Sequence, residues 1–402
     1  MNAIRLLAAC GLFTGIGVGP SAAADPPAKS ADPLRPPSVR SLAYSPDGTL
    51  LAAATREPGA VVVWDAASRK QLWVRRGPKA FSSVAFSPDG KSFAVTHDTR
   101  AARRFVSLTG EELGEVGPHP ATVRACVYLP GTDLLITGSD GVIRFWDVKV
   151  GKVVEELTGG HPAEVSALVP SPDGRWLISI GPDGTRGWDV AAGKELRDTL
   201  KQDRGTRWNG VTFVAPNRIL FGDNTATQHL LELPSGKELL RYKGWGDGIA
   251  YASAPGVAAF HYHSSDVRIM DLALRAPTVT ETAGIERILK DFDDDSYEMR
   301  VAAAKAMRAT GSVAEPALRQ AMTSGPSAEV RMRARETRKA ILEEPLRALK
   351  GHTARVGPMV FSPDGKVLAT GADDGTVRLW NPLTGQELAR LAVLESDQGQ
   401  SP

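Results

Sequence analysis

Tyr44-Ser45-Pro46-Asp47-Gly48 is one copy of a short motif that separates pairs of apolar runs in this 402-residue chain. The motif returns at residues 86–90 and 361–365, and residues 171–174 are a copy without the aromatic residue. Proline followed by Asp-Gly favours a tight turn, and an apolar run on each side is typical of a β-hairpin. The motif therefore predicts a protein built from repeated hairpins.

Two further markers recur with the motif. Tryptophan followed by Asp or Asn ends a β-rich run in four places, and a turn glycine lies five residues after most of the equivalent positions. These positions are Trp64, Phe105, Trp146, Trp188, Leu231, Met270 and Trp380. Successive positions lie about 40 residues apart, and the last interval is about 70 residues longer. The spacing predicts seven repeats and one insertion.

Each repeat contains four short β-prone runs, which in the third repeat are residues 123–128, 134–137, 142–146 and 153–157. With Gly160-His161, Gly351-His352 and the Trp-Asp pairs, this pattern resembles WD-repeat β-propeller blades. The resemblance covers residues 38–281 and 347–391 and is weaker in blades 2, 5 and 6, which lack the tryptophan. A β-sandwich with chance repeats is the rival, but four-stranded units bury both faces only by radial stacking. We expect an all-β fold, a seven-bladed WD-repeat β-propeller with a small all-α insertion between blades 6 and 7.

The family resemblance implies a hydrogen-bonded tetrad in the better-formed blades. It joins a histidine before the inner strand, a strand hydroxyl, a turn aspartate and the tryptophan, and it is a buried polar network rather than a catalytic triad. The matching residues are His352, Thr370, Asp374 and Trp380 in blade 7; His161, Ser179, Asp183 and Trp188 in blade 4; and His119, Thr137, Asp140 and Trp146 in blade 3. In blade 3 the histidine follows Pro118 instead of glycine, which departs from the family pattern.

The first 24 residues are predicted to be a signal peptide. Arg5 precedes an apolar run at residues 6–18, and Ala22-Ala23-Ala24 forms a cleavage site, so we expect export to the periplasm or the extracellular space. Lipidation at Cys10 and an uncleaved anchor are the alternatives. Residues 25–37 are predicted to be a linker, 38–281 blades 1–6, 282–346 the insertion, 347–392 blade 7 and 393–402 a disordered tail. Blades 1 and 7 each have their own four runs, which predicts ring closure without strand exchange.

The insertion changes from strand to helix periodicity. Residues 284–345 predict four short helices in two pairs, a pattern that resembles HEAT-type repeats. A unit in the link between the outer strand of blade 6 and the inner strand of blade 7 would stand on the face with the Gly-His turns. Its acidic and basic residues are equal in number, so nucleic-acid binding is not expected.

The sequence contains no motif of the common nucleotide-binding, hydrolase or zinc-protease classes. Cys126, in an inner strand, is expected to be a buried apolar residue. His261 and His263 share a strand face but lack a third metal ligand. The acidic run at residues 291–295 resembles a calcium loop without its glycine and its glutamate. We expect no enzymatic activity, no cofactor and no metal.

One ring of residues is the candidate binding site, because each lies just before an inner strand at the channel mouth on the Gly-His face. The ring is Ser38, Ala80, Thr122, Glu164, Trp208, Asp247 and Arg355, and we expect partner contacts at Thr122, Glu164, Trp208, Asp247 and Arg355. Trp208 has an alternative role in contact with the insertion. The leading hypothesis is a monomeric, exported scaffold that binds protein partners and does not span a membrane. Nucleic-acid binding is not expected, because the net charge is only +2. A ligand-binding or hydrolytic channel and a structural envelope component are the alternatives.

Overall fold

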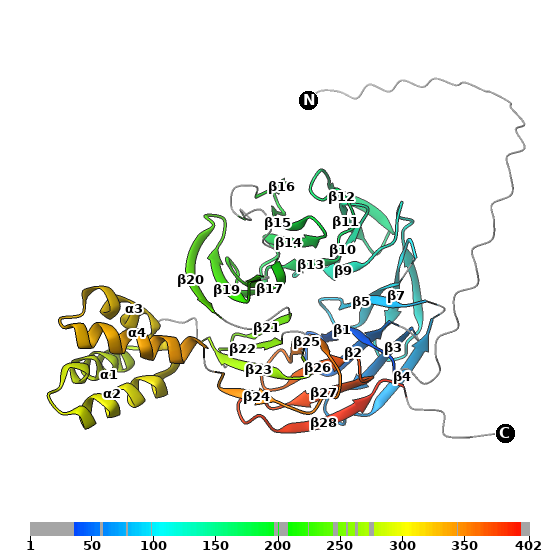
Figure 1. Cartoon of the computed structure of the whole chain (residues 1–402). Coiled ribbons are helices and arrows are strands. Elements are labelled where there is room, and N and C mark those ends of the chain that lie inside the picture. Colours follow the sequence, from blue (N-terminus) through cyan, green and yellow to red (C-terminus); the bar gives the residue numbers. More distant parts are fainter. Residues whose placement is uncertain are drawn as a thin grey trace, which may run out of the picture.

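Seven four-stranded antiparallel sheets form a ring in the part of the chain that the structure describes (Figure 1). This computed structural model describes residues 36–394, apart from 57–58, 78, 98, 197–199, 201–207, 224, 244–247, 255, 262–263, 273–276 and 344. The predicted signal peptide, most of the linker and most of the tail lie outside these residues. The seven sheets confirm the predicted seven-bladed propeller with a helical insertion ahead of its last blade.

The strands of each blade follow one another from the centre of the ring to its rim. The first three blades are β1 (Val39–Tyr44), β2 (Leu50–Thr55), β3 (Ala60–Asp65) and β4 (Gln71–Arg76); β5 (Phe81–Phe86), β6 (Ser92–His97), β7 (Ala102–Val106) and β8 (Glu112–Val116); and β9 (Ala125–Tyr128), β10 (Leu134–Ser139), β11 (Val142–Asp147) and β12 (Lys152–Leu157). Blades 4 and 5 are β13 (Ala167–Pro170), β14 (Trp176–Gly181), β15 (Gly184–Asp189) and β16 (Lys194–Glu195); and β17 (Trp208–Ala215), β18 (Arg218–Asp223), β19 (Thr227–Glu232) and β20 (Lys237–Lys243). The last two blades are β21 (Gly248–Ala252), β22 (Val257–His261), β23 (Val267–Asp271) and β24 (Arg347–Leu349); and β25 (Val356–Phe361), β26 (Leu368–Ala372), β27 (Thr376–Trp380) and β28 (Glu387–Ala392).

The Ser-Pro-Asp-Gly motif forms the turn between the first and second strands of a blade. In blade 1 the Ser45 hydroxyl donates to Asp47 Oδ1 over 2.5 Å and accepts the backbone N–H of Leu50 over 2.9 Å. Gly48 adopts φ +73°, a left-handed conformation that other residues reach only with strain. Because the serine satisfies two groups of the turn at once, the sequence motif fixes the hairpin locally.

The middle strands of the blades are buried on both faces. Residues 52–54 of β2 and 61–63 of β3 are fully buried, because each blade is covered by a neighbour on either side. This arrangement explains their continuous apolar sequence, since alternation is expected only where one face meets water. Each fully buried valine contributes roughly 1.5–3 kcal/mol by leaving water.

The ring closes by contact between blades 7 and 1. β1 lies beside β25 and β26, and Val39 fits against Gly371, where a β-carbon would collide with it. Within the described residues each of these blades supplies its own four strands, so no strand is exchanged, as predicted.

A helical insertion interrupts blade 6. The helices α1 (Val279–Lys290), α2 (Tyr297–Thr310), α3 (Glu315–Ser324) and α4 (Ala328–Glu343) follow β23 and precede β24. β24 pairs with β23 through Val267 and Leu349, so residues 347–349 complete blade 6. The predicted boundary, which placed the insertion between the blades and began blade 7 at residue 347, is therefore wrong by one strand. A three-residue strand is too short to show alternation in the sequence.

The insertion also leaves the propeller on the face opposite to the one predicted. In an antiparallel blade the third strand ends on the same face as the turn between the first two strands. Tyr251, near the end of β21, donates its hydroxyl to the carbonyl of Leu272, just after β23, over 3.3 Å. The helices therefore start at the Ser-Pro-Asp-Gly face, and the expectation that they stand over the Gly-His face is wrong.

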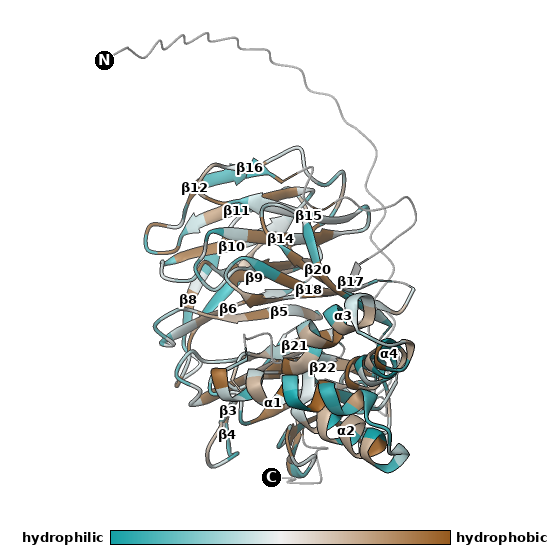
Figure 2. Cartoon of the chain, turned by 90° about the vertical axis from the view of Figure 1, so that its left-hand side faces the viewer, coloured by the Kyte–Doolittle hydropathy of each residue, from teal (hydrophilic) through white to brown (hydrophobic). Residues whose placement is uncertain are grey.

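The helices pack against the rims of blades 5 and 6 (Figures 1 and 2). Met307 and Leu342 share one hydrophobic core with Tyr242 of β20 and Met270 of β23. Asp271, at the end of β23, accepts the backbone N–H and the hydroxyl of Ser312, each over 2.9 Å. Along the described residues, no helix is both long and apolar enough to cross a membrane.

Candidate binding face

The predicted ring residues that the structure describes lie at or just before the starts of the inner strands, which surround the centre of the propeller (Figure 1). Glu164 and Arg355 are exposed, Thr122 is half-buried and Ala80 is buried. These positions therefore present both charged and covered side chains to the channel mouth on the Gly-His face. Their role in partner binding stays a prediction.

Two ring residues are described only in part or not at all. Trp208 begins β17, where its backbone pairs with Asp223, and its side chain is not described. Asp247 lies outside the described residues. The predicted contacts of both side chains with a partner therefore stay untested.

Bulges reshape the inner strands at the channel mouth. The pairing register shifts between Val39 and Ser41 in β1, and comparable shifts occur at the starts of β5 and β25. A bulge leaves one residue out of the ladder and turns its side chain in a new direction. In β1 the residue at this shift is Arg40, which is exposed.

Glu164 of the ring is paired with a neighbouring cation. Arg124 Nε lies 2.6 Å from Glu164 Oε2, and both side chains are about half exposed. An ion pair at this exposure contributes little stability, but it balances the local charge between blades 3 and 4.

Blades 7 and 1 bring together three arginines and one aspartate, Arg40, Arg56, Arg355 and Asp373, called the arginine cluster below. The Arg56 N–H donates to the Ser38 carbonyl over 2.8 Å, and the Asp373 N–H donates to the Arg355 carbonyl over 2.9 Å. The Ser38 hydroxyl donates to Asp373 Oδ1 and connects the two blades.

The charges of the other cluster residues act on the Arg40 guanidinium. Burial and the charge of Arg56 lower the pKa of Arg40, Asp373 acts in the opposite direction, and Arg355 lowers it further. The sequence analysis identified Arg355 alone. The sequence could have placed Arg40 and Arg56 on the same face as Arg355, because the ends of second strands and the starts of first strands share one face of an antiparallel blade.

The tetrads of blades 7 and 4 form closed hydrogen-bond networks. In blade 7, Trp380 Nε1 donates to Thr370 Oγ1 over 2.9 Å, His352 Nε2 lies 2.7 Å from the same hydroxyl, and His352 Nδ1 lies 2.9 Å from Asp374 Oδ2. In spite of burial, the bonds from His352, Thr376 and the Thr353 N–H hold the pKa of Asp374 far below its usual value. Blade 4 has the same bonds, all within 2.8 Å, among its four predicted residues His161, Ser179, Asp183 and Trp188. The hydroxyls are buried behind the tryptophans, so these are structural networks.

The blade 3 tetrad is incomplete, which corrects the prediction. Trp146 Nε1 donates to Thr137 Oγ1 over 2.8 Å, but His119 Nε2 is 3.5 Å from that hydroxyl and His119 Nδ1 has no hydrogen-bond partner among the described residues. Asp140 instead binds Arg144 Nη1 over 2.9 Å. The interval between the strand hydroxyl and the turn aspartate is one residue shorter in blade 3 than in blades 4 and 7. Asp140 therefore faces a different partner.

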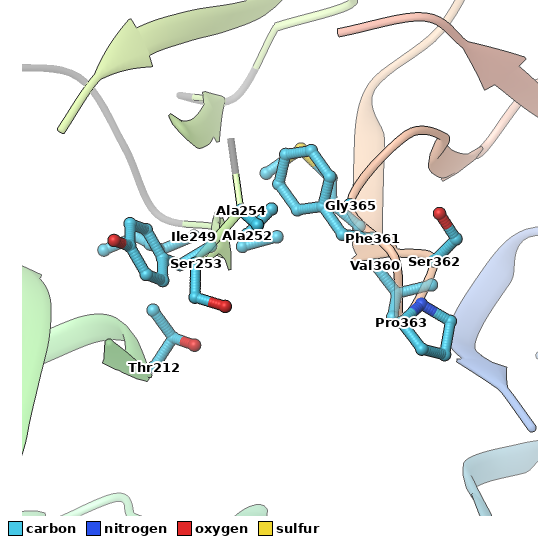
Figure 3. A pocket seen from close by; sticks show the side chains of 13 residues that line it. Thr212, Ile249, Ala252, Ser253, Ala254, Val360, Phe361, Ser362, Pro363 and Gly365 are labelled. Carbon is cyan, nitrogen blue, oxygen red and sulfur yellow. The ribbon is translucent and has the colours of Figure 1, made fainter. Parts of the chain in front are cut away.

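A cavity of about 300 Å³ lies between blades 6 and 7 (Figure 3). Thr212, Tyr251 and Ser253 line one side, and Met359 and Phe361 line the other. Apart from the Tyr251 phenol, the lining residues carry no titratable side chain, so the cavity offers no carboxylate, imidazole or thiol for acid–base or nucleophilic catalysis. A channel enzyme gains no support from this cavity.

Other candidate reactive groups are occupied or buried. Cys126 is buried, and burial raises the pKa of its thiol to about 12, so it stays protonated. His261 Nε2 lies 2.8 Å from the carbonyl of Gly357, and His263 lies outside the described residues. Across the described ranges, no group of three or more His, Cys, Asp and Glu side chains is placed to hold a metal ion.

Comparison with known proteins identifies the repeats. The family model "WD domain, G-beta repeat" matches residues 34–65, 110–147, 151–185 and 343–381. The chain therefore contains WD40 repeats, and its fold is a seven-bladed WD-repeat β-propeller. WD-repeat proteins generally mediate protein–protein interactions.

Similarity to curated proteins is confined to short segments. "Ribosome biogenesis protein ERB1" of Yarrowia lipolytica is 47% identical over 51 residues, which are 13% of this chain and 6% of that protein. "Apoptotic protease-activating factor 1" of Rattus norvegicus is 45% identical over 58 residues, or 14% of this chain and 5% of that protein. The chain thus matches less than a tenth of the length of these relatives.

Proposed function

We propose that this protein is a non-enzymatic scaffold that binds a protein partner on the Gly-His face of its propeller. The observation that carries the proposal is the exposed, charged channel mouth, with Glu164, Arg355 and the rest of the arginine cluster held at the starts and ends of rigid strands. A pre-organised surface loses little conformational entropy when a partner binds. The tetrads stabilise blades 4 and 7, which carry Glu164 and Arg355.

Site-specific photo-crosslinking tests the choice of face. A photoreactive residue at Thr122 lies on the Gly-His face, whereas Thr109 and Thr384 are exposed turn residues on the opposite face and serve as matched controls. We expect a crosslinked partner from Thr122 in the native extract and none from the two controls. Crosslinks from Thr109 or Thr384 alone would move the binding surface to the other face.

A second candidate function is the binding of a small ligand in the cavity between blades 6 and 7 (Figure 3). The cavity favours a small molecule with apolar surface and one or two hydroxyl contacts, because Thr212, Tyr251 and Ser253 lie beside apolar residues. Substitution Ser253→Trp would fill it, and a thermal-shift screen of both forms would detect a ligand that stabilises only the unfilled one. A structural envelope component is a third candidate.

We also propose export, because residues 1–24 combine a basic start, an apolar run and a small-residue cleavage site. N-terminal sequencing of the protein from its native cells tests this, with a start near Asp25 expected. Cleavage before Cys10 would favour the lipidated form instead. The two helix pairs, which resemble HEAT-type repeats, would offer a separate surface on the opposite face.

A further inference from the structure

His229 of β19 lies between two carboxylates in blade 5, and these three residues are called the His229 bridge below. Its Nδ1 lies 2.7 Å from Glu238 Oε1 of β20, and its Nε2 lies 3.1 Å from Asp223 Oδ2 at the end of β18. The ring stacks on Phe221 with a centroid distance of 4.8 Å, and only 12% of the side chain is exposed. Both ring nitrogens therefore face a carboxylate oxygen in a mostly buried position.

Both carboxylates of the bridge are ionised acceptors. Asp223 Oδ1 accepts the N–H and the hydroxyl of Thr225 and the N–H of Thr227, at 2.7–2.9 Å. Glu238 Oε1 also accepts a hydrogen bond from Arg241 Nε over 2.9 Å. In spite of burial, these bonds and those to the histidine hold the pKa values of both carboxyl groups below their usual values. The protons of the bridge must therefore come from the imidazole.

The protonation state of the histidine decides whether both of its bonds can form. A neutral imidazole has one N–H and one lone pair, whereas the imidazolium donates from both nitrogens. Between two ionised acceptors, a neutral ring would turn its lone pair toward one of the carboxylates, so the geometry favours the charged ring. The histidines of the blade 4 and blade 7 tetrads differ, because each faces one carboxylate and one hydroxyl, and a neutral ring satisfies both.

Arginine takes the place of this histidine in blades 3 and 4. Arg144 and Arg186 each bridge a turn aspartate and a glutamate of the outer strand. Arginine keeps its charge at every pH that a folded protein normally meets, whereas histidine changes charge near neutral pH. Blade 5 thus has a pH-sensitive form of a bridge that is permanent in blades 3 and 4.

The bridge reaches the strand against which the helical insertion packs. Glu238 precedes Leu239, whose carbonyl accepts a hydrogen bond from Arg319 Nη1 of α3 over 3.2 Å. Leu240 and Tyr242, further along β20, belong to the hydrophobic core of the helices. A weaker bond at Glu238 would therefore loosen the strand that holds the insertion.

The other charged groups around the bridge, among the described residues, are basic. Arg241 and Arg319 make the bonds given above, and Lys243 Nζ donates to the hydroxyl of Thr227 over 3.2 Å. Lysine and arginine ordinarily titrate well above neutral pH. Near neutral pH the imidazole is thus the group whose charge changes.

We infer that the His229 bridge is a pH-sensitive link between blade 5 and the helical insertion, closed when the histidine carries its proton and weakened when the proton is lost. A histidine that the fold holds in its protonated form adds stability below the unfolded value of about 6.5, and this stability is lost as the pH rises. The insertion should therefore be attached most firmly in mildly acidic solution. The link lies away from the Gly-His face, so it stands or fails independently of the proposed binding function.

Urea unfolding of the full chain at about pH 6 and about pH 9 tests the link, with His229→Arg as the matched variant. We expect the unfolding equilibrium constant of the parent, divided by that of the variant, to rise about tenfold or more between the two pH values. His229→Gln, which is neutral at both pH values, gives a second reference for which the same rise is expected. Ratios that do not change with pH would overturn the inference.

Nuclear magnetic resonance of the chain with ¹⁵N-labelled histidine reads the protonation state directly. The His229 signals are assigned by their absence from the spectrum of His229→Arg. We expect both ring nitrogens of His229 to carry protons at about pH 7.5, and a neutral His229 ring at this pH would overturn the inference.

Hydrogen–deuterium exchange locates the effect in the structure. After correction for the intrinsic rate, we expect β20, α3 and α4 to lose protection at about pH 9 in the parent and to keep it in His229→Arg. Blade 1, which has the buried Val62 at the equivalent position, is the internal control and should behave alike in both proteins. Equal protection of β20 and the helices in both proteins, or an equal loss in blade 1, would contradict a local link to the insertion.

Discussion

Blades 7 and 5 hold four similar strands together by different chemistry. In blade 7 the tetrad of His352, Thr370, Asp374 and Trp380 connects the strands from within. In blade 5, Phe221 lies where blade 7 has Thr370 and Leu231 where it has Trp380, so the polar network is replaced by apolar contacts.

Blade 5 compensates with one histidine and with the helical insertion. His229 Nδ1 lies 2.7 Å from Glu238 and Nε2 lies 3.1 Å from Asp223. At this position blades 3 and 4 use an arginine to bridge a turn aspartate and a glutamate of the outer strand. In blade 7, Arg378 contacts Glu387. Leu240 and Tyr242 of its outer strand join the core of the helices. We infer that a blade can lack the hydrogen-bonded tetrad when a neighbouring element packs apolar side chains against it.

Deletion of residues 277–345 with a short linker is expected to have the largest effect. It would expose Met270, Tyr242 and Leu240, which share a core with the helices, so we expect a loss of several kcal/mol of unfolding free energy or a loss of cooperative folding. Urea unfolding followed by circular dichroism measures this. A deletion variant as stable as the parent would mean that blade 5 does not depend on the helices.

Thr370→Val should destabilise blade 7 by about 2–3 kcal/mol. The substitution keeps the shape but leaves Trp380 Nε1 and His352 Nε2 buried without their shared hydroxyl. Thr109→Val, at an exposed turn, is the control and should change stability by less than about 0.5 kcal/mol. Equal unfolding midpoints for the two variants would remove the tetrad as the stabilising element.

Asp374→Asn should lower stability at neutral pH by about 1–2 kcal/mol and have little effect in strong acid. The folded pKa of Asp374 is depressed, so its contribution is fully present above the unfolded value of about 4 and is lost as pH falls through the folded value. Unfolding measured from pH 7 down to pH 2 tests this, with Glu111→Gln, at an exposed residue, as control. A difference from the parent that stays constant with pH would contradict it.

His119→Phe should have the smallest effect, about 1 kcal/mol or less at pH 7.5, because the blade 3 network is already open. Burial, followed by the charge of Arg144, lowers the pKa of His119 to about 4. The stability that neutral histidine provides is therefore present above about pH 6.5 and is lost as pH falls towards about 4. Over this pH range the unfolding free energy of the His119→Phe variant should fall less than that of the parent. At pH 7.5, His352→Phe should lower the unfolding free energy more than His119→Phe does. The reverse order would contradict the comparison of the blades.

The parts of the fold that repeat locally could be predicted from the sequence. Ser45, Asp47 and Gly48 form their turn with neighbours in the chain. In blades 4 and 7 the histidine lies 18 residues before the hydroxyl, and the tryptophan follows the hydroxyl by 9 or 10 residues. The aspartate of blade 3 could not be placed, because a shift of one residue in a turn changes which side chain it faces.

The sequence by itself determined the number of blades, their hairpins and two complete tetrads, since each depends on contacts within one repeat of the chain. Only the tertiary structure decided that β24 completes blade 6 after the helices, that the helices leave the propeller at the Ser-Pro-Asp-Gly face and pack against the rims of blades 5 and 6, and that Ser38 connects blade 1 to blade 7. These features join residues far apart in the chain, as Ser38 joins Asp373, and no local periodicity records such a contact.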